Sequence, residues 1–277
     1  GLPESAIDLG RQTAMEKNLE GYVFTLQAPS YIPFLTYSAK RNLRQKMYMA
    51  YNTMCTHDNE NNNIAIVGKI VNLHRELAQM LGYETYADYA LSQRMAENTP
   101  NVHKLLNDLI DAYMPTALAE VKEVEDLYYE DNDIDPSTLS ESDPRRFMPW
   151  DFSFYSNKLK ERKFNINSEM LRPYFQLSKV KEGVFGLATK LYGITFRKNT
   201  DAPVYHLDVD VYDVIDKDGT PLALFYCDFH PRASKKSGAW MTSFKEQWIS
   251  KEGTNSRPQV SIVMNFSKPT ENKPALL

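Results

Sequence analysis

The sequence is short of the features that mark most enzyme classes. Its 277 residues include only two cysteines, Cys55 and Cys227, which is too few for a disulfide framework and is typical of a reducing compartment. The eleven glycines are dispersed and form neither G-x-G-x-x-G nor G-x-x-x-x-G-K-S/T, so no phosphate-binding loop is indicated. No G-x-S-x-G elbow is present, so nothing indicates a serine nucleophile of that type.

Charge and hydropathy exclude two classes of partner. Lysine and arginine total 32 against 36 aspartates and glutamates, a formal charge of −4, which favours neither nucleic acid nor an anionic membrane. No apolar run approaches the roughly 20 residues that span a bilayer. The start, "GLPESAIDLG", lacks the basic and apolar regions of a signal peptide. We expect a cytoplasmic protein, or a periplasmic or exported one if a leader precedes Gly1.

Histidines do not form a metal-binding motif. The sequence has five, and no two of them stand at the i, i+4 spacing of H-E-x-x-H. His206 and His230 fall at the ends of two strands that we expect to pair, so they could approach each other. Zinc needs three or four converging ligands, however, which favours hydrogen-bonded or solvated histidines here. We therefore predict no catalytic residue and no metal site within these residues.

Helical patterns dominate what is present. Apolar residues recur on one helical face at Ile66, Ile70, Leu73 and Leu77, and a longer helix is predicted over residues 99–129. From Thr195 the pattern alternates as in strands, with the turn "KDGT" between two of them. The sequence thus predicts a mainly α chain with a small antiparallel sheet near its C-terminal end. We divide it into a helical body, residues 1–194, and a sheet region, residues 195–277.

One stretch concentrates charge and small residues. "FYCDFHPRASKKSGAWM", residues 225–241, reads as a strand, a basic loop and a second strand. This stretch contains three cations, Arg232, Lys235 and Lys236. They could form a positive rim that binds a substrate carboxylate, or they could be the solvated tip of a hairpin. Charge runs are usually solvated, so we expect the hairpin tip. His230 and Asp228 are expected to be structural.

Four stretches in this order resemble the thimet oligopeptidase family of zinc metallopeptidases. They are residues 58–97, "PWDFSFYSNKLKER", residues 213–241 and "VMNFSKPTENKPALL". Gly238-Ala239-Trp240-Met241 points to the peptidyl-dipeptidase (dipeptidyl carboxypeptidase) branch. The resemblance implies a zincin-like, neurolysin-type fold with two helical lobes, and short peptides as partners.

The resemblance also implies where the catalytic residues lie. In the family, H-E-x-x-H follows within about a dozen residues of a segment like "NFSKPTENKPALL", with zinc bound to its histidines. We therefore expect this chain to be a middle fragment of a metallopeptidase that ends just before that motif. Zinc is expected in the intact parent and not in this fragment, which should be inactive by itself.

A substrate-binding strand is the role that the resemblance gives to residues 225–241. Gly238, Ala239 and Trp240 would offer backbone groups to an extended peptide, and Gly238 would be small to allow close approach of another backbone. Two alternatives remain. One is an oligoendopeptidase of the same family, and the other is a helical peptide-binding module without catalysis.

Overall fold

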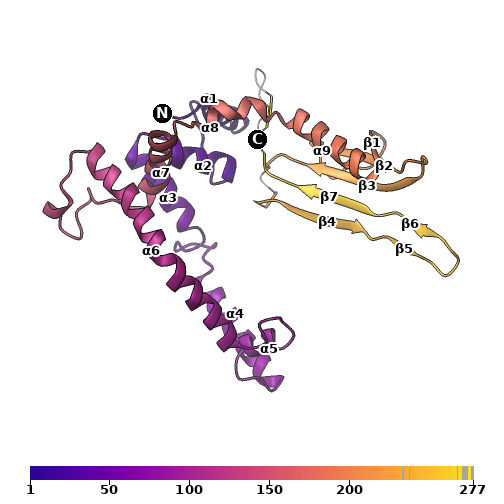
Figure 1. Cartoon of the computed structure of the whole chain (residues 1–277), viewed down its shortest axis with the longest axis horizontal. Coiled ribbons are helices and arrows are strands. Elements are labelled where there is room, and N and C mark those ends of the chain that lie inside the picture. The colour runs from indigo at the N-terminus through magenta and orange to yellow at the C-terminus, as the bar shows by residue number, and fades with distance from the viewer. Residues whose placement is uncertain (233, 237, 267, 270–273, 276–277) are drawn as a thin grey trace. The chain divides into compact units, whose positions relative to one another are not determined.

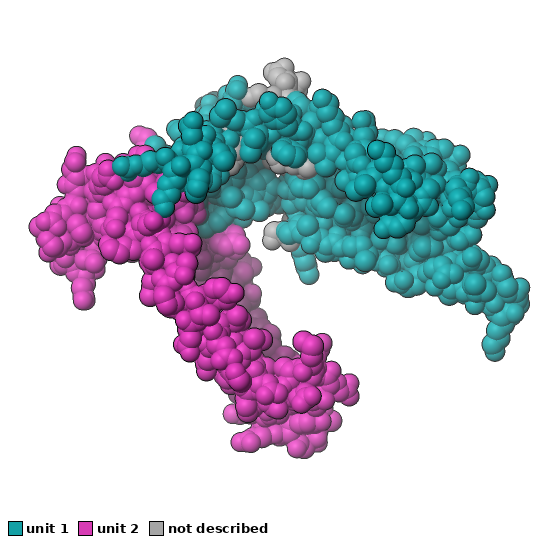
Figure 2. Space-filling model, viewed as in Figure 1, with its two compact units in different colours: residues 1–39, 160–277 teal, residues 40–159 magenta. Residues whose placement is uncertain are grey.

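The computed structural model describes residues 1–232, 234–236, 238–266, 268–269 and 274–275. The chain forms two compact units, coloured separately in Figure 2. The first combines residues 1–39 with residues 160–277, and the second consists of residues 40–159.

Helices account for the regular structure before residue 195 (Figure 1). They are α1 (Glu4–Glu16), α2 (Ala28–Tyr37), α3 (Arg41–Asn52), α4 (Ile64–Met80), α5 (Tyr86–Leu91), α6 (Thr99–Asp131), α7 (Pro149–Phe164), α8 (Ser168–Leu171) and α9 (Leu177–Tyr192), with 3-10 turns η1 (Pro136–Thr138) and η2 (Arg172–Tyr174). Two helix-end signals are present. The Thr85 side chain accepts a hydrogen bond from the backbone N–H of Asp88, and Gly193 ends α9 in a left-handed conformation.

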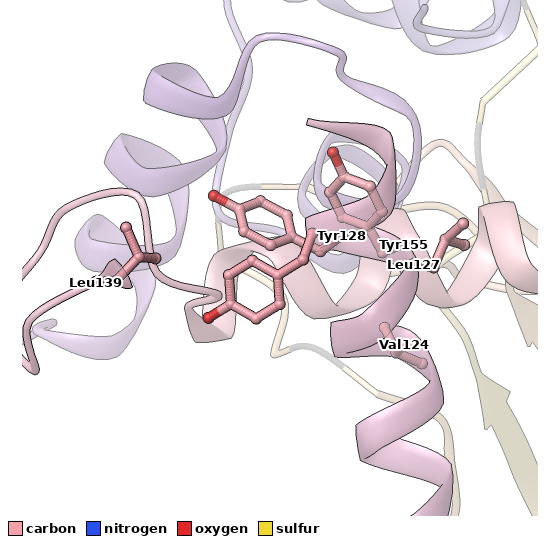
Figure 3. Packing of buried hydrophobic residues seen from close by; sticks show 6 residues of the cluster. Val124, Leu127, Tyr128, Leu139 and Tyr155 are labelled. Carbon is pink, nitrogen blue, oxygen red and sulfur yellow. The ribbon is translucent and has the colours of Figure 1, made fainter. Parts of the chain in front are cut away.

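The second unit is organised around the end of α6. This helix has 33 residues and is therefore about 50 Å long. Its last turns pack against α7 and the segment between them through a buried cluster (Figure 3), made up of Val124, Leu127, Tyr128, Tyr129, Leu139 and Tyr155. Beside it, the buried carboxylate of Asp151 accepts hydrogen bonds from Arg41 and from Arg44, the latter over 2.7 Å. These contacts fix α3 against the start of α7.

The sheet in the first unit is mixed rather than antiparallel. Its strands are β1 (Thr195–Lys198), β2 (Val209–Ile215), β3 (Pro221–Asp228), β4 (Trp240–Lys245) and β7 (Gln259–Val263), in the order β1-β2-β3-β7-β4, and β5 (Trp248–Ile249) pairs separately with β6 (Asn255–Ser256). The prediction of a mainly α chain with a small sheet is confirmed. The prediction that the sheet is wholly antiparallel is wrong, because β3 and β7 run parallel.

The same order corrects the hairpin interpretation of residues 225–241. Strands β3 and β4 do not pair with each other, because β7 lies between them and pairs with both. The segment joining them is therefore a connection across the end of β7 and not a hairpin tip. Periodicity locates strands along the chain but carries no information about which strand enters between two others.

Helix α9 covers one face of this sheet. The Phe185 ring stacks on Phe196 of β1 at a centroid distance of 4.0 Å, and its edge contacts Tyr212 of β2 at 5.0 Å. On the opposite face, Val209, Val211 and Tyr226 form a smaller buried cluster. Within the described part of the chain, no helix is both long and apolar enough to cross a membrane.

The predicted division at residues 194/195 matches the change from helices to strands, since α9 ends at Tyr192 and β1 begins at Thr195. The compact units group the chain differently, because the first unit contains helices from both ends of residues 1–194. As a statement about domains, the division at residue 194 stays a prediction.

Candidate functional site

Strand β4 forms one edge of the sheet. It pairs with β7 on one side, and no other strand among the described residues pairs with it on the other. Its side chains are accessible, with Trp240, Met241 and Phe244 exposed at 37%, 66% and 53%. An unpaired edge presents a row of N–H and C=O groups that an extended chain can join.

The hydrogen bonds of β7 determine which groups of β4 face outward. The N–H of Leu224 donates to Pro258 and the N–H of Met264 donates to Asp228, so the even-numbered residues of β7 direct their backbone groups to β3. The odd-numbered residues Ser261 and Val263 must then face β4, because successive residues alternate.

The partners of Ser261 and Val263 on β4 are Thr242 and Trp240. The backbone groups of these two residues therefore turn inward and bond to β7. The backbone groups of Met241 and Ser243, which alternate with these residues, point away from the sheet. The register of β4 shifts between Ser243 and Lys245, which limits this regular pattern to the first part of the strand.

The three predicted substrate-binding residues lie together at the start of this edge. Gly238 has a φ of +98°, a conformation that favours glycine, and apart from Gly238 and its chain neighbours no described atom lies within 4 Å of the position a Cβ would occupy. The backbone carbonyl of Gly238 accepts a hydrogen bond from Asn265 Nδ2 over 2.7 Å. Ala239 is exposed, and Trp240 opens the strand opposite Val263. Positive φ is thus the local reason for a glycine here.

The loop before Gly238 is anchored by a buried ion cluster. Asp228, 1% exposed, accepts two hydrogen bonds of 2.9 Å from Arg232 and one of 3.0 Å from Tyr205. Lys235 Nζ donates to the same carboxylate over 3.0 Å and to the backbone carbonyls of Asp228 and His230. The expectation of solvated cations is therefore wrong for Arg232 and Lys235, since the Lys235 side chain is only 2% exposed.

Burial and hydrogen bonds shift the pKa values of the ionisable groups in this cluster. Burial by itself would raise the pKa of Asp228, but hydrogen bonds from Arg232, Lys235 and Tyr205 outweigh it and hold this pKa below the ordinary value. Burial lowers the pKa of Lys235 despite the attraction of Asp228. The cluster thus keeps a carboxylate ionised in a place that water hardly reaches. Lys236 is exposed, while Ala233 and Ser237 lie outside the described residues.

The histidines that could have approached a metal are held by hydrogen bonds. His230 Nδ1 lies 3.4 Å from the carbonyl oxygen of Phe266, and burial lowers the pKa of His230. His206 Nδ1 accepts the backbone N–H of Asp208 over 3.2 Å. Across the described ranges, no group of three His, Cys, Asp or Glu side chains gathers to hold a metal ion.

Comparison with known proteins identifies the family. The model of peptidase family M3 matches residues 34–277. The chain belongs to this family. Among M3 relatives, oligopeptidase A of Escherichia coli and that of Salmonella typhimurium are each 35% identical to it over 280 residues, which cover 100% of this chain and 40% of each relative. Dipeptidyl carboxypeptidase of Escherichia coli is 33% identical, with 100% of this chain and 39% of the relative covered. The chain spans about 40% of the length of these relatives.

Two parts of the site were not predicted from the sequence, namely Asn265 and the outward-facing residues of β4. Asn265 lies two residues after the end of β7, at a position where an asparagine is indistinguishable from an ordinary turn residue. The sequence also could not show that the backbone groups of Met241 and Ser243, and not those of Trp240, face outward. Alternation along a strand allows either set of alternate residues to face outward, and only the pairing with β7 decides between them.

Proposed function

We propose that this chain is the peptide-binding part of a zinc metallopeptidase of the M3 family that hydrolyses short peptides. The observation that carries the proposal is the edge of β4 that no other described strand joins, with outward backbone groups at Met241 and Ser243. A peptide added to this edge would be held by main-chain hydrogen bonds, which do not read side chains. We therefore expect many short peptides to bind. The names of the relatives, oligopeptidase A and dipeptidyl carboxypeptidase, support the same substrate class.

Gly238, Ala239 and Trp240 are proposed as the substrate-contacting residues at the start of the strand. Ala239 is exposed directly before β4 and would offer its backbone groups to the peptide. Trp240 contributes its side chain, since its backbone groups bond to β7. Gly238 supplies the positive φ that leads into the strand.

Zinc is the cofactor that the family implies, and the residues in hand do not fit it. The described residues gather no ligand group, and the sequence contains no H-E-x-x-H. We therefore assign no step of the hydrolysis and no catalytic residue to this chain. We propose that the zinc ligands belong to other residues of a longer parent protein, and that residues 1–277 hydrolyse no peptide by themselves.

Within the family, two reactions are proposed in order. The first is release of dipeptides from the free C-terminus of short peptides, for which Gly238-Ala239-Trp240-Met241 is the supporting feature. The second is cleavage inside short peptides, which the relatives named oligopeptidase A favour at 35% identity. Product analysis of the parent on one nonapeptide separates them, because only the first reaction releases dipeptides in sequence from the C-terminus.

The proposal is tested on this chain with a fluorescently labelled pentapeptide. We expect saturable binding by anisotropy, displacement by unlabelled peptide, and no turnover with or without added Zn²⁺. Absence of saturable binding would contradict a peptide-binding part. Tight, stoichiometric zinc together with turnover would contradict the assignment of catalysis to residues outside the chain. If the parent reading frame lacks H-E-x-x-H, the chain is a peptide-binding module without catalysis.

A further inference from the structure

The connection between β3 and β4 is attached to the rest of the unit at two points. At its base, Arg232 and Lys235 bind the buried carboxylate of Asp228, the last residue of β3. At its far end, the Asn265 side-chain amide donates to the carbonyls of Lys236 and Gly238, over 3.0 and 2.7 Å. The described part of this connection is thus held both where it leaves β3 and where it enters β4.

The base attachment ties three segments together. Lys235 Nζ reaches the Asp228 carboxylate, the Asp228 carbonyl and the His230 carbonyl over 2.8–3.0 Å. Arg232 bonds to both oxygens of the same carboxylate, and its own carbonyl accepts Gln27 Nε2 from the N-terminal end of α2. Because Asp228 and Lys235 are almost fully buried, these bonds are shielded from competition by water.

The far attachment belongs to the same frame. Asn265 lies between Met264, whose N–H donates to Asp228, and Phe266, whose N–H donates to Phe229. The backbone that carries Asn265 is therefore hydrogen-bonded to the residues at the base of the connection. Asn265 donates two hydrogen bonds from one amide group, so its orientation is set by both acceptors.

We infer that Asn265 and the Asp228–Lys235 pair are positioning residues that fix the register in which β4 enters the sheet. The inference rests on the proposed function, since it concerns the edge that would bind the peptide. A slip of β4 by one residue would turn the backbone groups of Met241 and Ser243 inward and those of Trp240 outward. By fixing Gly238 two residues before the strand, Asn265 selects which row of groups a peptide meets.

The test for Asn265 uses two substitutions in the full chain. Asn265→Asp keeps the shape but removes both N–H donors, and Asn265→Gln keeps the donors on a longer side chain. The control is Asn52→Asp, which removes a comparable bond from an exposed amide to the carbonyl of Tyr48 on α3. Amide exchange at Trp240, which is bonded to β7, and affinity for the labelled pentapeptide are measured in all three.

We expect Asn265→Asp to speed exchange at Trp240 roughly ten-fold and to weaken peptide binding about five-fold. Asn265→Gln should recover part of both, and Asn52→Asp should change neither. Unchanged exchange at Trp240 in Asn265→Asp, or an equal change in Asn52→Asp, would overturn the inference. If the unmodified chain binds no peptide, the proposed function fails, while the exchange measurement still decides the positioning role.

The test for the base uses Lys235→Met, which leaves Arg232 to neutralise Asp228. The control is Lys122→Met, which removes the exposed pair with Asp126 on α6. We expect amide exchange at Trp240 to be about five-fold faster in Lys235→Met and unchanged in the control. A lower melting temperature with unchanged exchange at Trp240 would mean that the pair only stabilises the sheet, and would overturn its positioning role.

Discussion

At the scale of single residues, Asp228 is the carboxylate that anchors the loop of the candidate site. It is buried at the end of β3 and is held by Arg232, Lys235 and Tyr205. The sequence analysis predicted a structural role for Asp228 but did not identify its partners. It could not indicate that Lys235 is buried, since burial of a cation depends on a carboxylate that the fold supplies.

The pKa of Asp228 predicts how stability changes with pH. Its folded-state pKa lies below the ordinary value of 3.8, so ionised Asp228 stabilises the fold above that pH. The contribution is lost as the pH falls from about 3.8 through the lower folded-state pKa. Asp228→Asn should reduce the free energy of unfolding at pH 7 by about 3 kcal/mol, because two cations lose their partner.

This prediction is measured by thermal unfolding between pH 7 and pH 2. The stability difference between the unmodified chain and Asp228→Asn should shrink as the pH falls below about 4. The control is Asp201→Asn, in the exposed segment between β1 and β2, where solvent screens the carboxylate and the profile should hardly change. A stability difference that stays constant down to pH 2 would show that the Asp228 charge is not what stabilises the loop.

At the scale of elements, the sequence predicted the kinds of structure better than their partners. The alternating pattern from Thr195 and the stretch 225–241 predicted the strands that form β2, β3 and β4. The insertion of β7 between β3 and β4 was not predictable, because strand pairing is decided by tertiary contacts and not by local pattern. The outward row of β4 depends on that insertion and was missed for the same reason.

Helix α9 provides a prediction at this scale. The half-buried ring of Phe185 contacts Phe196, Tyr212 and Phe225 across three strands. Phe185→Ala should lower the free energy of unfolding by about 2 kcal/mol, since it removes an aromatic contact from one face of the sheet. Val184→Ala, one residue earlier and 59% exposed, should cost less than about 0.5 kcal/mol. Denaturation followed by tryptophan fluorescence measures both, and equal losses would mean that α9 does not stabilise the sheet through Phe185.

At the scale of the whole molecule, the periodicity of α4 predicted a helix but not what covers it. The apolar residues that define its predicted face remain 44–86% exposed, among them Ile66, Ile70, Leu73, Leu77 and Met80. A periodic pattern records which face of a helix favours burial, and burial itself needs another element. The described residues supply none for this face, so the sequence was a better guide to local structure than to packing.

Family membership and the edge of β4, which no other strand of the described residues joins, together make peptide binding the central claim for the whole chain. The most direct measurement is a scan of one pentapeptide, N-methylated at one residue at a time and tested for affinity to the unmodified chain. If the peptide extends β4, every second N–H bonds to the strand, so affinity should fall about five- to ten-fold at alternate positions and little between them. Equal effects at all positions, or none at any, would contradict strand addition at β4.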